Sequence, residues 1–280
     1  MSWVSDGSEL APDAAPPWLK PLVDNAKDIK RAYRRRVPPE VLAMVTAADT
    51  KATVTGERRD AAVLVLFSGR PDLQPGSGPG EADLLVTVRA STLRHHAGQA
   101  AFPGGAADPG DTGPVHTALR EANEETGIDV GRLQPLATLE RLFIPPSGFH
   151  VVPVLAYSPD PGPVEVVDEA ETAVVARVPV RAFVNPENRI MVYRKENTRR
   201  FAGPAFLLNE MLVWGFTGQV ISARVTSSPR MEKPPDIIRL WAMNCLSSSE
   251  MAGPDQAIQP SESRKRRCCS RGSSASRSCS

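Results

Sequence analysis

Three glutamates in one predicted helix form the part of this sequence best suited to chemistry. Residues 113–128 read GPVHTALREANEETGI, and because helical residues follow one another at about 100°, Glu121, Glu124 and Glu125 fall on one face. Like charges three or four residues apart cost about 0.2–0.5 kcal/mol per pair. Carboxylates in the last turns also oppose the helix dipole, by about 0.3–1 kcal/mol each. A helix shaped only by stability would avoid this cluster, and such local conflict is typical of a functional site.

A hard divalent cation would relieve this repulsion. Mg²⁺ and Mn²⁺ take oxygen ligands and are commonly shared between carboxylates and substrate phosphates. Arg120, which directly precedes the cluster, could hold one carboxylate in position. The alternative is a solvated acidic helix face, and the helix alone does not decide between the two.

The loop before the helix favours the functional interpretation. Residues 102–105 read Phe-Pro-Gly-Gly, a turn in which Gly104 and Gly105 let the backbone approach a ligand closely or supply a positive φ. The chain continues through Asp108 and Asp111 into the glutamate helix. A Gly-Gly turn alone is a weak signal. Followed by an acidic loop and an Arg-Glu-x-x-Glu-Glu-x-Gly helix, it becomes a strong one.

The helix carries the signals of both ends and of a buried side. Pro114 suits the first turn, and Gly127 suits a left-handed residue that ends the helix. Asp111 or Thr112 stands where its side chain could cap the first turn. Apolar residues at helical spacing predict a stripe that faces a core, namely Val115, Ala118, Leu119 and Ala122.

Short apolar runs on both sides of this helix predict strands. Residues 61–67 indicate a buried strand, and residues 83–89 indicate its hairpin partner across a Gly/Pro-rich loop at 69–81. Residues 206–225 read as a strand that runs into a helix. Short strands with few helices predict an α+β domain over residues 21–225. Further strands are expected within residues 136–144, 150–157, 173–180 and 190–194.

Both ends of the chain differ in composition from this domain. Residues 1–20 are rich in Pro and Ala and predict a flexible segment, with Trp18 and Leu19 as anchors. Residues 18–36 could form an irregular helix that Pro21 interrupts, and the arginines at 34–36 read as its solvated end. Residues 226–246 form an extension of uncertain structure. Residues 247–280 are a basic Ser/Arg-rich stretch that predicts a disordered tail.

Composition argues against several classes of function. The 280 residues carry a formal net charge of +1, so no overall field recruits nucleic acid or an anionic membrane. The basic tail could touch nucleic acid, but a solvated tail is the preferred interpretation. The four cysteines form no Cys-x-x-Cys pair, which argues against a zinc site and favours a reducing compartment. With no signal peptide and no 18-residue apolar run, we expect a cytoplasmic protein.

The residues from 120 onward resemble a known family. Residues 120–128, REANEETGI, match in full the end of the Nudix hydrolase box, Arg-Glu-apolar-x-Glu-Glu-x-Gly-apolar. The front of the box departs from the general pattern, because Thr112 stands where the box has a glutamate and the Gly-Gly pair lies further upstream.

This departure is similar to the coenzyme A diphosphatase branch of that family. The branch carries an upstream motif, L-L-T-x-R-[S/A]-x₃-R-x₃-G-x₃-F-P-G-G, which matches residues 85–105 with Arg89, Arg94 and Gly98 in place and Val86 for the usual Leu. Residues 151–154 (VVPV) and 214–217 (WGFT) also resemble the branch. The resemblance covers residues 20–222 and gives no account of the tail.

The resemblance implies a fold and a reaction. The fold would be a mixed β-sheet sandwiched between helices, an α/β/α form of the α+β class. The reaction would be hydrolysis of the diphosphate bond of coenzyme A or acyl-CoA to 3′,5′-ADP and (acyl-)4′-phosphopantetheine, with Mg²⁺ or Mn²⁺. The alternatives are another nucleoside diphosphate derivative, such as ADP-ribose or NADH, and a catalytically silent binding module. We expect a small-molecule substrate, without nucleic acid or membrane, and leave a homodimer open.

The resemblance also implies roles for single residues. Glu121 and Glu125 would be the primary metal ligands, and Glu124 a third ligand or a base acting through water, with Arg120 in the same catalytic set. Guanidinium groups bind phosphate in a bidentate manner, so we expect a substrate-binding set of Arg89, Arg94, Gly104 and Gly105. His95 and His96 suit surface exposure better than Mg²⁺ binding.

Overall fold

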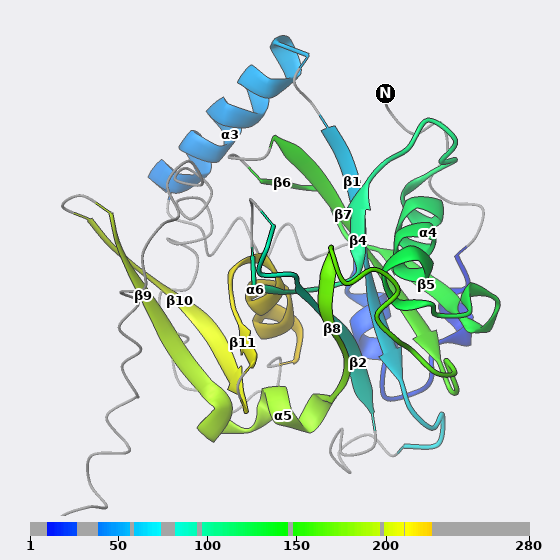
Figure 1. Cartoon of the computed structure of the whole chain (residues 1–280). Coiled ribbons are helices and arrows are strands. Elements are labelled where there is room, and N and C mark those ends of the chain that lie inside the picture. The colour runs from blue at the N-terminus through cyan, green and yellow to red at the C-terminus, as the bar shows by residue number, and fades with distance from the viewer. Residues whose placement is uncertain are drawn as a thin grey trace, which may run out of the picture.

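Two ten-residue strands run side by side through the middle of the computed structural model (Figure 1). Strands β1 (Arg59–Ser68) and β7 (Phe149–Ser158) pair in parallel over their whole length. Both are buried almost throughout, as expected of apolar strands covered on two faces. The structure describes residues 10–26, 39–56, 59–73, 82–93, 97–144, 148–196, 199–209 and 211–225.

The main sheet has the strand order β3-β2-β1-β7-β5. Along one edge, β1 meets two antiparallel neighbours in turn, because Ala61–Val63 pair with β4 whereas Phe67 and Ser68 pair with β2. Between them the Leu64 N–H donates to the carbonyl of Pro103. The other strands of this sheet are β2 (Asp83–Arg89), β3 (Ala100–Ala101), β4 (Gly104–Ala106), β5 (Gln134–Thr138), β6 (Leu142–Ile144), which pairs with β7, and β8 (Thr172–Pro179), which pairs with β2.

Alternate residues of β1 face two separate apolar clusters. Ala62, Leu64 and Leu66 pack with residues of helix α4 (Pro114–Thr126), which covers one face of the sheet. Val65 and Phe67 point to the opposite face. This period of two is the one that a strand imposes, and it places helices on both faces.

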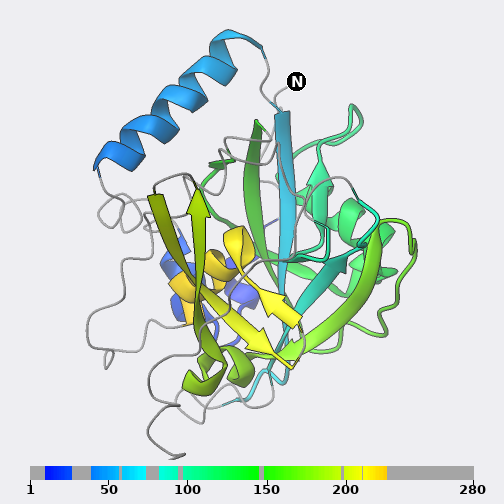
Figure 2. The same cartoon turned by 60° about the vertical axis from the view of Figure 1, so that its left-hand side comes forward.

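The second face is covered by α1 (Lys20–Asp24), α5 (Val180–Val184), α6 (Gly215–Val225) and a three-stranded sheet. Figures 1 and 2 both show this smaller sheet on the side of the main sheet away from α4. Phe183 and Phe206 meet edge to face there, with their ring centroids 5.3 Å apart. The strands of the smaller sheet are β9 (Arg189–Glu196), β10 (Arg199–Leu208) and β11 (Met211–Val213), and three short 3₁₀ helices are η1 (Pro12–Ala14), η3 (Val130–Arg132) and η4 (Pro186–Asn188).

The arrangement confirms the predicted α+β class and the sheet between helices. The strands expected at 61–67 and 83–89 are β1 and β2, and they are antiparallel neighbours. The strand and helix expected within 206–225 are the end of β10, then β11 and α6. Among the described residues, no helix combines the length and apolarity needed to cross a bilayer.

Residues 10–20 of the N-terminal segment pack against the domain. Ala15 and Leu19 are buried, and the Ala11 N–H donates to the Pro135 carbonyl at 2.8 Å. Trp18 and Leu19 are confirmed as anchors, and the Trp18 Nε1–H donates to the carbonyl of Arg70 at 3.1 Å. The helix expected over 18–36 is described only as the five residues of α1. Residues 27–38, including the arginines, lie outside the described residues, as do 226–280 with the predicted extension and tail.

Two of the described helices, α3 and the five-residue α5, were not predicted. Helix α3 (Pro39–Val54) stands at the periphery in both views (Figures 1 and 2). Its Asp49 carboxylate lies 2.6 Å from Nε2 of the buried His150 on β7. The sequence of α3 mixes Ala, Val and Thr all round the helix, so it gives no apolar stripe to detect.

Candidate active site

Helix α4 begins without the side-chain cap that the sequence suggested. Its N-cap is Gly113, and no side chain bonds to the first-turn N–H groups, although Pro114 starts the helix as expected. Gly127 ends it in the left-handed conformation with φ 65°, and its N–H donates to the Asn123 carbonyl at 2.8 Å. The expectation that Asp111 or Thr112 caps the helix is therefore wrong, and Asp111 has other partners.

Asp111 lies almost fully buried, with a side chain 1% exposed, and its carboxylate accepts hydrogen bonds from several sides. Thr117 Oγ1 donates to it at 2.8 Å, the Asp108 N–H at 2.9 Å, and Arg120 at 3.0 and 3.1 Å. Burial alone would raise the pKa of Asp111, but the hydrogen bonds from Arg120, Asp108 and Thr117 outweigh it and hold this pKa well below its usual range. Asp111 is thus a fixed anion beneath Arg120.

Arg120 connects this buried anion to the glutamates. Its Nη2 donates to Glu121 Oε1 at 3.1 Å and to the Ala106 carbonyl at 3.0 Å, while its Nη1 donates to Glu124 Oε2 at 2.8 Å. The planar guanidinium suits such simultaneous contacts because its donors point outward in a fixed fork. The structure therefore brings Arg120 against two of the three predicted carboxylates.

Gly104 and Gly105 begin strand β4 and do not form the predicted turn. Their backbone lies close to other parts of the protein. A side chain at Gly104, where φ is +155°, would overlap the Ala62 carbonyl and the Cα of Val63 on β1. A Cβ at Gly105 would lie 2.5 Å from the carboxylate atoms of Glu121. The two glycines let β4 fit between β1 and α4, and the Gly104 N–H donates to Glu125 Oε2 at 3.4 Å.

Glu121 and Glu125 are carboxylates with little solvent around them. Burial raises the pKa of Glu125 to about 7; the positive charge of Arg89 opposes this rise, and the negative charge of Glu121 adds to it. Burial also raises the pKa of Glu121, against the effect of Arg120. The positive charges of Arg120 and Arg89 compensate these two carboxylates only in part. Their oxygens form a set of hard ligands, which fits a divalent cation such as Mg²⁺ or Mn²⁺.

Glu124 lies differently from its two neighbours. Its side chain is 56% exposed and pairs with Arg120. In the part of the chain that the structure describes, no three side chains of metal-ligand type converge on one point. Gathering Glu124 with Glu121 and Glu125 would require it to leave Arg120.

Arg89 reaches the same cluster from the end of β2. Its Nε is buried and has no hydrogen-bond partner among the described residues, while its charge acts on Glu125. A buried guanidinium donor without a partner costs free energy, and a phosphate oxygen would satisfy it. Arg94, the second predicted phosphate ligand, lies outside the described residues together with His95 and His96.

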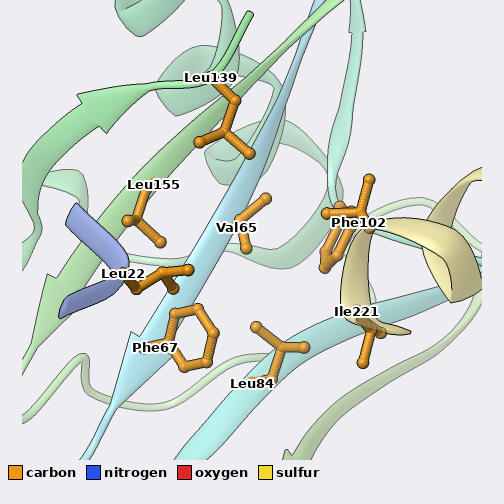
Figure 3. A pocket seen from close by; sticks show the side chains of 9 residues that line it. Leu22, Val65, Phe67, Leu84, Phe102, Leu139, Leu155 and Ile221 are labelled. Carbon is orange, nitrogen blue, oxygen red and sulfur yellow. The ribbon is translucent and has the colours of Figure 1, made fainter. Parts of the chain in front are cut away.

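An apolar cavity lies on the opposite face of the sheet (Figure 3). All nine of its lining residues are apolar, among them Val65, Phe67 and Leu84, so it offers no side-chain donor for a phosphate. Phe102 points into this cavity, whereas the next residues reach α4. Phe102 therefore anchors the start of β4 from behind the site.

The fold and the site define the class of protein: an α/β/α domain with a carboxylate cluster suited to binding a cation and a phosphate. A model of the NUDIX domain matches residues 57–199. The chain is 33% identical over 168 residues to an uncharacterised Nudix hydrolase, NudL, of Photorhabdus laumondii, covering 60% of this chain and 84% of that protein. It is 36% identical over 172 residues to the NudL of Cronobacter sakazakii, covering 59% and 80%.

Among solved structures, the chain is similar to the Nudix hydrolase RenU of M. smegmatis, with 26% identity and a TM-score of 0.37. The similarity covers 46% of this chain and 74% of RenU. The chain belongs to the Nudix hydrolase family, and it is a hydrolase of nucleoside diphosphate derivatives. Members of this family generally need a divalent metal ion such as Mg²⁺ or Mn²⁺.

Sequence reasoning missed two features of the site. Asp111 was given a capping role, because its partner Arg120 lies nine residues on, a spacing that no local rule detects. Glu171 lies on a separate loop, 46 residues further along, and its negative charge contributes to the raised pKa of Glu125. No motif marks it.

Replacing Arg120 tests the buried anchor. In Arg120→Gln, the buried Asp111 loses its cation, so the free energy of unfolding at pH 7 should fall by about 3–5 kcal/mol. Because the folded-state pKa of Asp111 is depressed, its stabilisation is full above the unfolded pKa of about 3.9 and is lost as pH falls. The difference from wild type, measured by urea unfolding, should therefore shrink from pH 7 to pH 3.

The control is Arg132→Gln, which removes a half-exposed arginine paired with Asp129 and Asp160 and should cost less than about 1 kcal/mol. Equal losses in the two variants would contradict the anchoring role of Arg120.

Replacing Gly105 separates binding from stability. In Gly105→Ala, the new methyl group would displace only the end of the Glu121 side chain, so the melting temperature should change little. Mn²⁺ affinity, measured by calorimetry, should fall by about 10–100-fold, as for changes that disturb the orientation of a ligand. Gly110→Ala is the matched control, because nothing lies within 4 Å of its new Cβ. Unchanged Mn²⁺ affinity in Gly105→Ala would refute the role given to Glu121.

Proposed function

We propose that this chain hydrolyses the diphosphate bond of coenzyme A or acyl-CoA to 3′,5′-ADP and (acyl-)4′-phosphopantetheine. The observation that carries the proposal is the meeting of two sequence motifs at one place. Arg89 and Gly105 belong to the motif at residues 85–105 that resembles the coenzyme A diphosphatase branch, and Glu121 and Glu125 belong to the Nudix box. The charge of Arg89 acts on Glu125, and Gly105 lies against Glu121.

In this proposal, Glu121 and Glu125 would hold the cation, with Glu124 as a third ligand or as a base that acts through water. When bound, the cation supplies neutralisation of the diphosphate charge as it grows in the transition state. Arg120 keeps the Glu121 carboxylate in place through its hydrogen bond at 3.1 Å.

The substrate is held by groups of opposite charge. Arg89 donates to a phosphate oxygen from the end of β2, where its Nε faces no protein acceptor among the described residues. Arg94, Gly104 and Gly105 complete the proposed substrate-binding set. Water attacks one phosphorus, and the bond from that phosphorus to the bridging oxygen breaks.

A substrate panel tests the proposal. With Mg²⁺ or Mn²⁺, the protein should convert coenzyme A to 3′,5′-ADP and 4′-phosphopantetheine, detected by chromatography. The kcat/KM should be higher for coenzyme A or an acyl-CoA than for ADP-ribose or NADH. Glu121→Gln should abolish turnover, because a neutral amide is a poor ligand for a hard cation.

Three results would count against the proposal. A higher kcat/KM on ADP-ribose or NADH would assign the other nucleoside diphosphate substrate. Folded protein without turnover on any of these compounds would favour a silent binding module. Turnover that survives in Glu121→Gln would remove the metal assignment.

A further inference from the structure

The Trp-Gly-Phe-Thr stretch at residues 214–217 places a tryptophan beside the candidate active site. Trp214 is the single residue between β11 and α6, and both of these elements pack against β3. Strand β3 pairs with the end of β2, where the Arg89 N–H donates to the Gln99 carbonyl at 3.0 Å. The chain then continues from β3 into β4 with its glycine pair. Trp214 is therefore attached to elements that border the strand between Arg89 and the glycine pair.

The backbone on both sides of Trp214 is held in place. Gly215 has a φ of 64°, so the chain turns sharply directly after the tryptophan. The Trp214 carbonyl accepts from the Gly218 N–H at 3.3 Å. A Cβ at Gly218 would lie 3.1 Å from the Val213 carbonyl oxygen and 3.2 Å from that of Pro204, so the first turn of α6 packs directly on the backbone of β10 and β11. These contacts fix the position of Trp214 without using its side chain.

The ring of Trp214 takes no part in this packing. Its neighbours Val213 and Phe216 pack in the apolar cluster on the second face of the sheet, whereas Trp214 belongs to neither of the two clusters formed by the described residues. The ring is half-buried, and within the part of the chain that the structure describes it makes no hydrogen bond and no contact with another ring. Trp18 shows the contrast, because it meets two other rings edge to face and donates to the Arg70 carbonyl. Trp214 thus offers a large aromatic surface to a ligand.

Coenzyme A has one group that suits such a surface. Its adenine base is planar and aromatic, whereas its pantetheine arm is a flexible chain without a ring. Bases stack on aromatic side chains because every base has a π face. If the diphosphate lies at Arg89, Glu121 and Glu125, the nucleoside has to continue along one side of the site, and the junction of β11 and α6 supplies an aromatic ring beside it.

We propose that Trp214 binds the adenine base of the substrate by stacking. The contact lies away from the reacting atoms, so it contributes to affinity and to the choice of nucleotide and not to bond cleavage itself. The inference rests on the proposed function only for the identity of the pantetheine half, because adenine is also part of ADP-ribose and NADH.

The experiment compares Trp214→Ala with Phe149→Ala, which removes a half-buried ring from β7, on the other side of β1 from β2 and β3. Loss of one base-aromatic stack costs about 5–150-fold in affinity, so the calorimetric Kd of 3′,5′-ADP should rise by that factor in Trp214→Ala. The Kd of 4′-phosphopantetheine should stay within twofold of wild type. Trp214→Phe, which keeps an aromatic face, should bind 3′,5′-ADP more tightly than Trp214→Ala. In turnover of coenzyme A, KM should rise in Trp214→Ala while kcat stays within threefold of wild type.

Four results would overturn the inference. They are a 3′,5′-ADP affinity in Trp214→Ala within twofold of wild type, an equal loss of affinity for 3′,5′-ADP and 4′-phosphopantetheine, an equal loss in Phe149→Ala, or a Trp214→Phe variant as weak as Trp214→Ala. Trp214→Leu, which keeps apolar bulk without an aromatic ring, replaces the alanine variant in each comparison if that variant does not fold.

Wild-type turnover and binding are measured first, so that the two proposals fail separately. If the protein hydrolyses ADP-ribose or NADH but not coenzyme A, the substrate proposal fails, and stacking is tested with 5′-AMP against ribose 5-phosphate, which lacks the base. If wild type binds neither 3′,5′-ADP nor 5′-AMP, the stacking inference fails whatever the protein hydrolyses.

Discussion

The ion pair between Arg120 and the buried Asp111 is the interaction on which the arrangement of the site depends. Removing the charge of Asp111 from water is costly, and only the hydrogen bonds that converge on it make its ionised form stable. Because Asp111 fixes Arg120, the guanidinium can hold Glu121 and Glu124 on the other side. One arginine thus partly offsets the repulsion among carboxylates that the helix could not otherwise carry.

Small residues supply the second constraint. Ala118 and Ala122 let α4 pack closely on β1, and Gly104 and Gly105 let β4 fit in the remaining space. Two antiparallel strands share the edge of β1, and the chain crosses between them at Pro103. Because β1 pairs with β2 at one end and with β4 at the other, the main sheet brings the motif at residues 85–105 next to the motif at residues 120–128.

Much of this fold follows from local patterns in the sequence. Strands β1 and β2 and the first and last residues of α4 were predicted from period-two and helical patterns, which report burial directly. The sheet between helices was implied by the family resemblance. The helical pattern gave no signal for α3, because its apolar residues surround the helix. It also gave none for the packing of residues 10–20, because their partners lie far along the chain. Asp111 and Glu171 were not predicted for the same reason: Arg120 is the partner of Asp111, and Glu125 feels the charge of Glu171, only because the chain is folded.

The glutamate cluster lowers the stability of the fold in exchange for cation binding, and Glu125→Gln tests this exchange most directly. The burial of an ionised Glu125 costs free energy at neutral pH, and a neutral amide of the same shape removes that cost. In EDTA at pH 8, the variant should melt at a higher temperature than wild type, while Mn²⁺ should raise the melting temperature of wild type only. A variant that melts lower in EDTA, or that Mn²⁺ stabilises as strongly as wild type, would contradict the account.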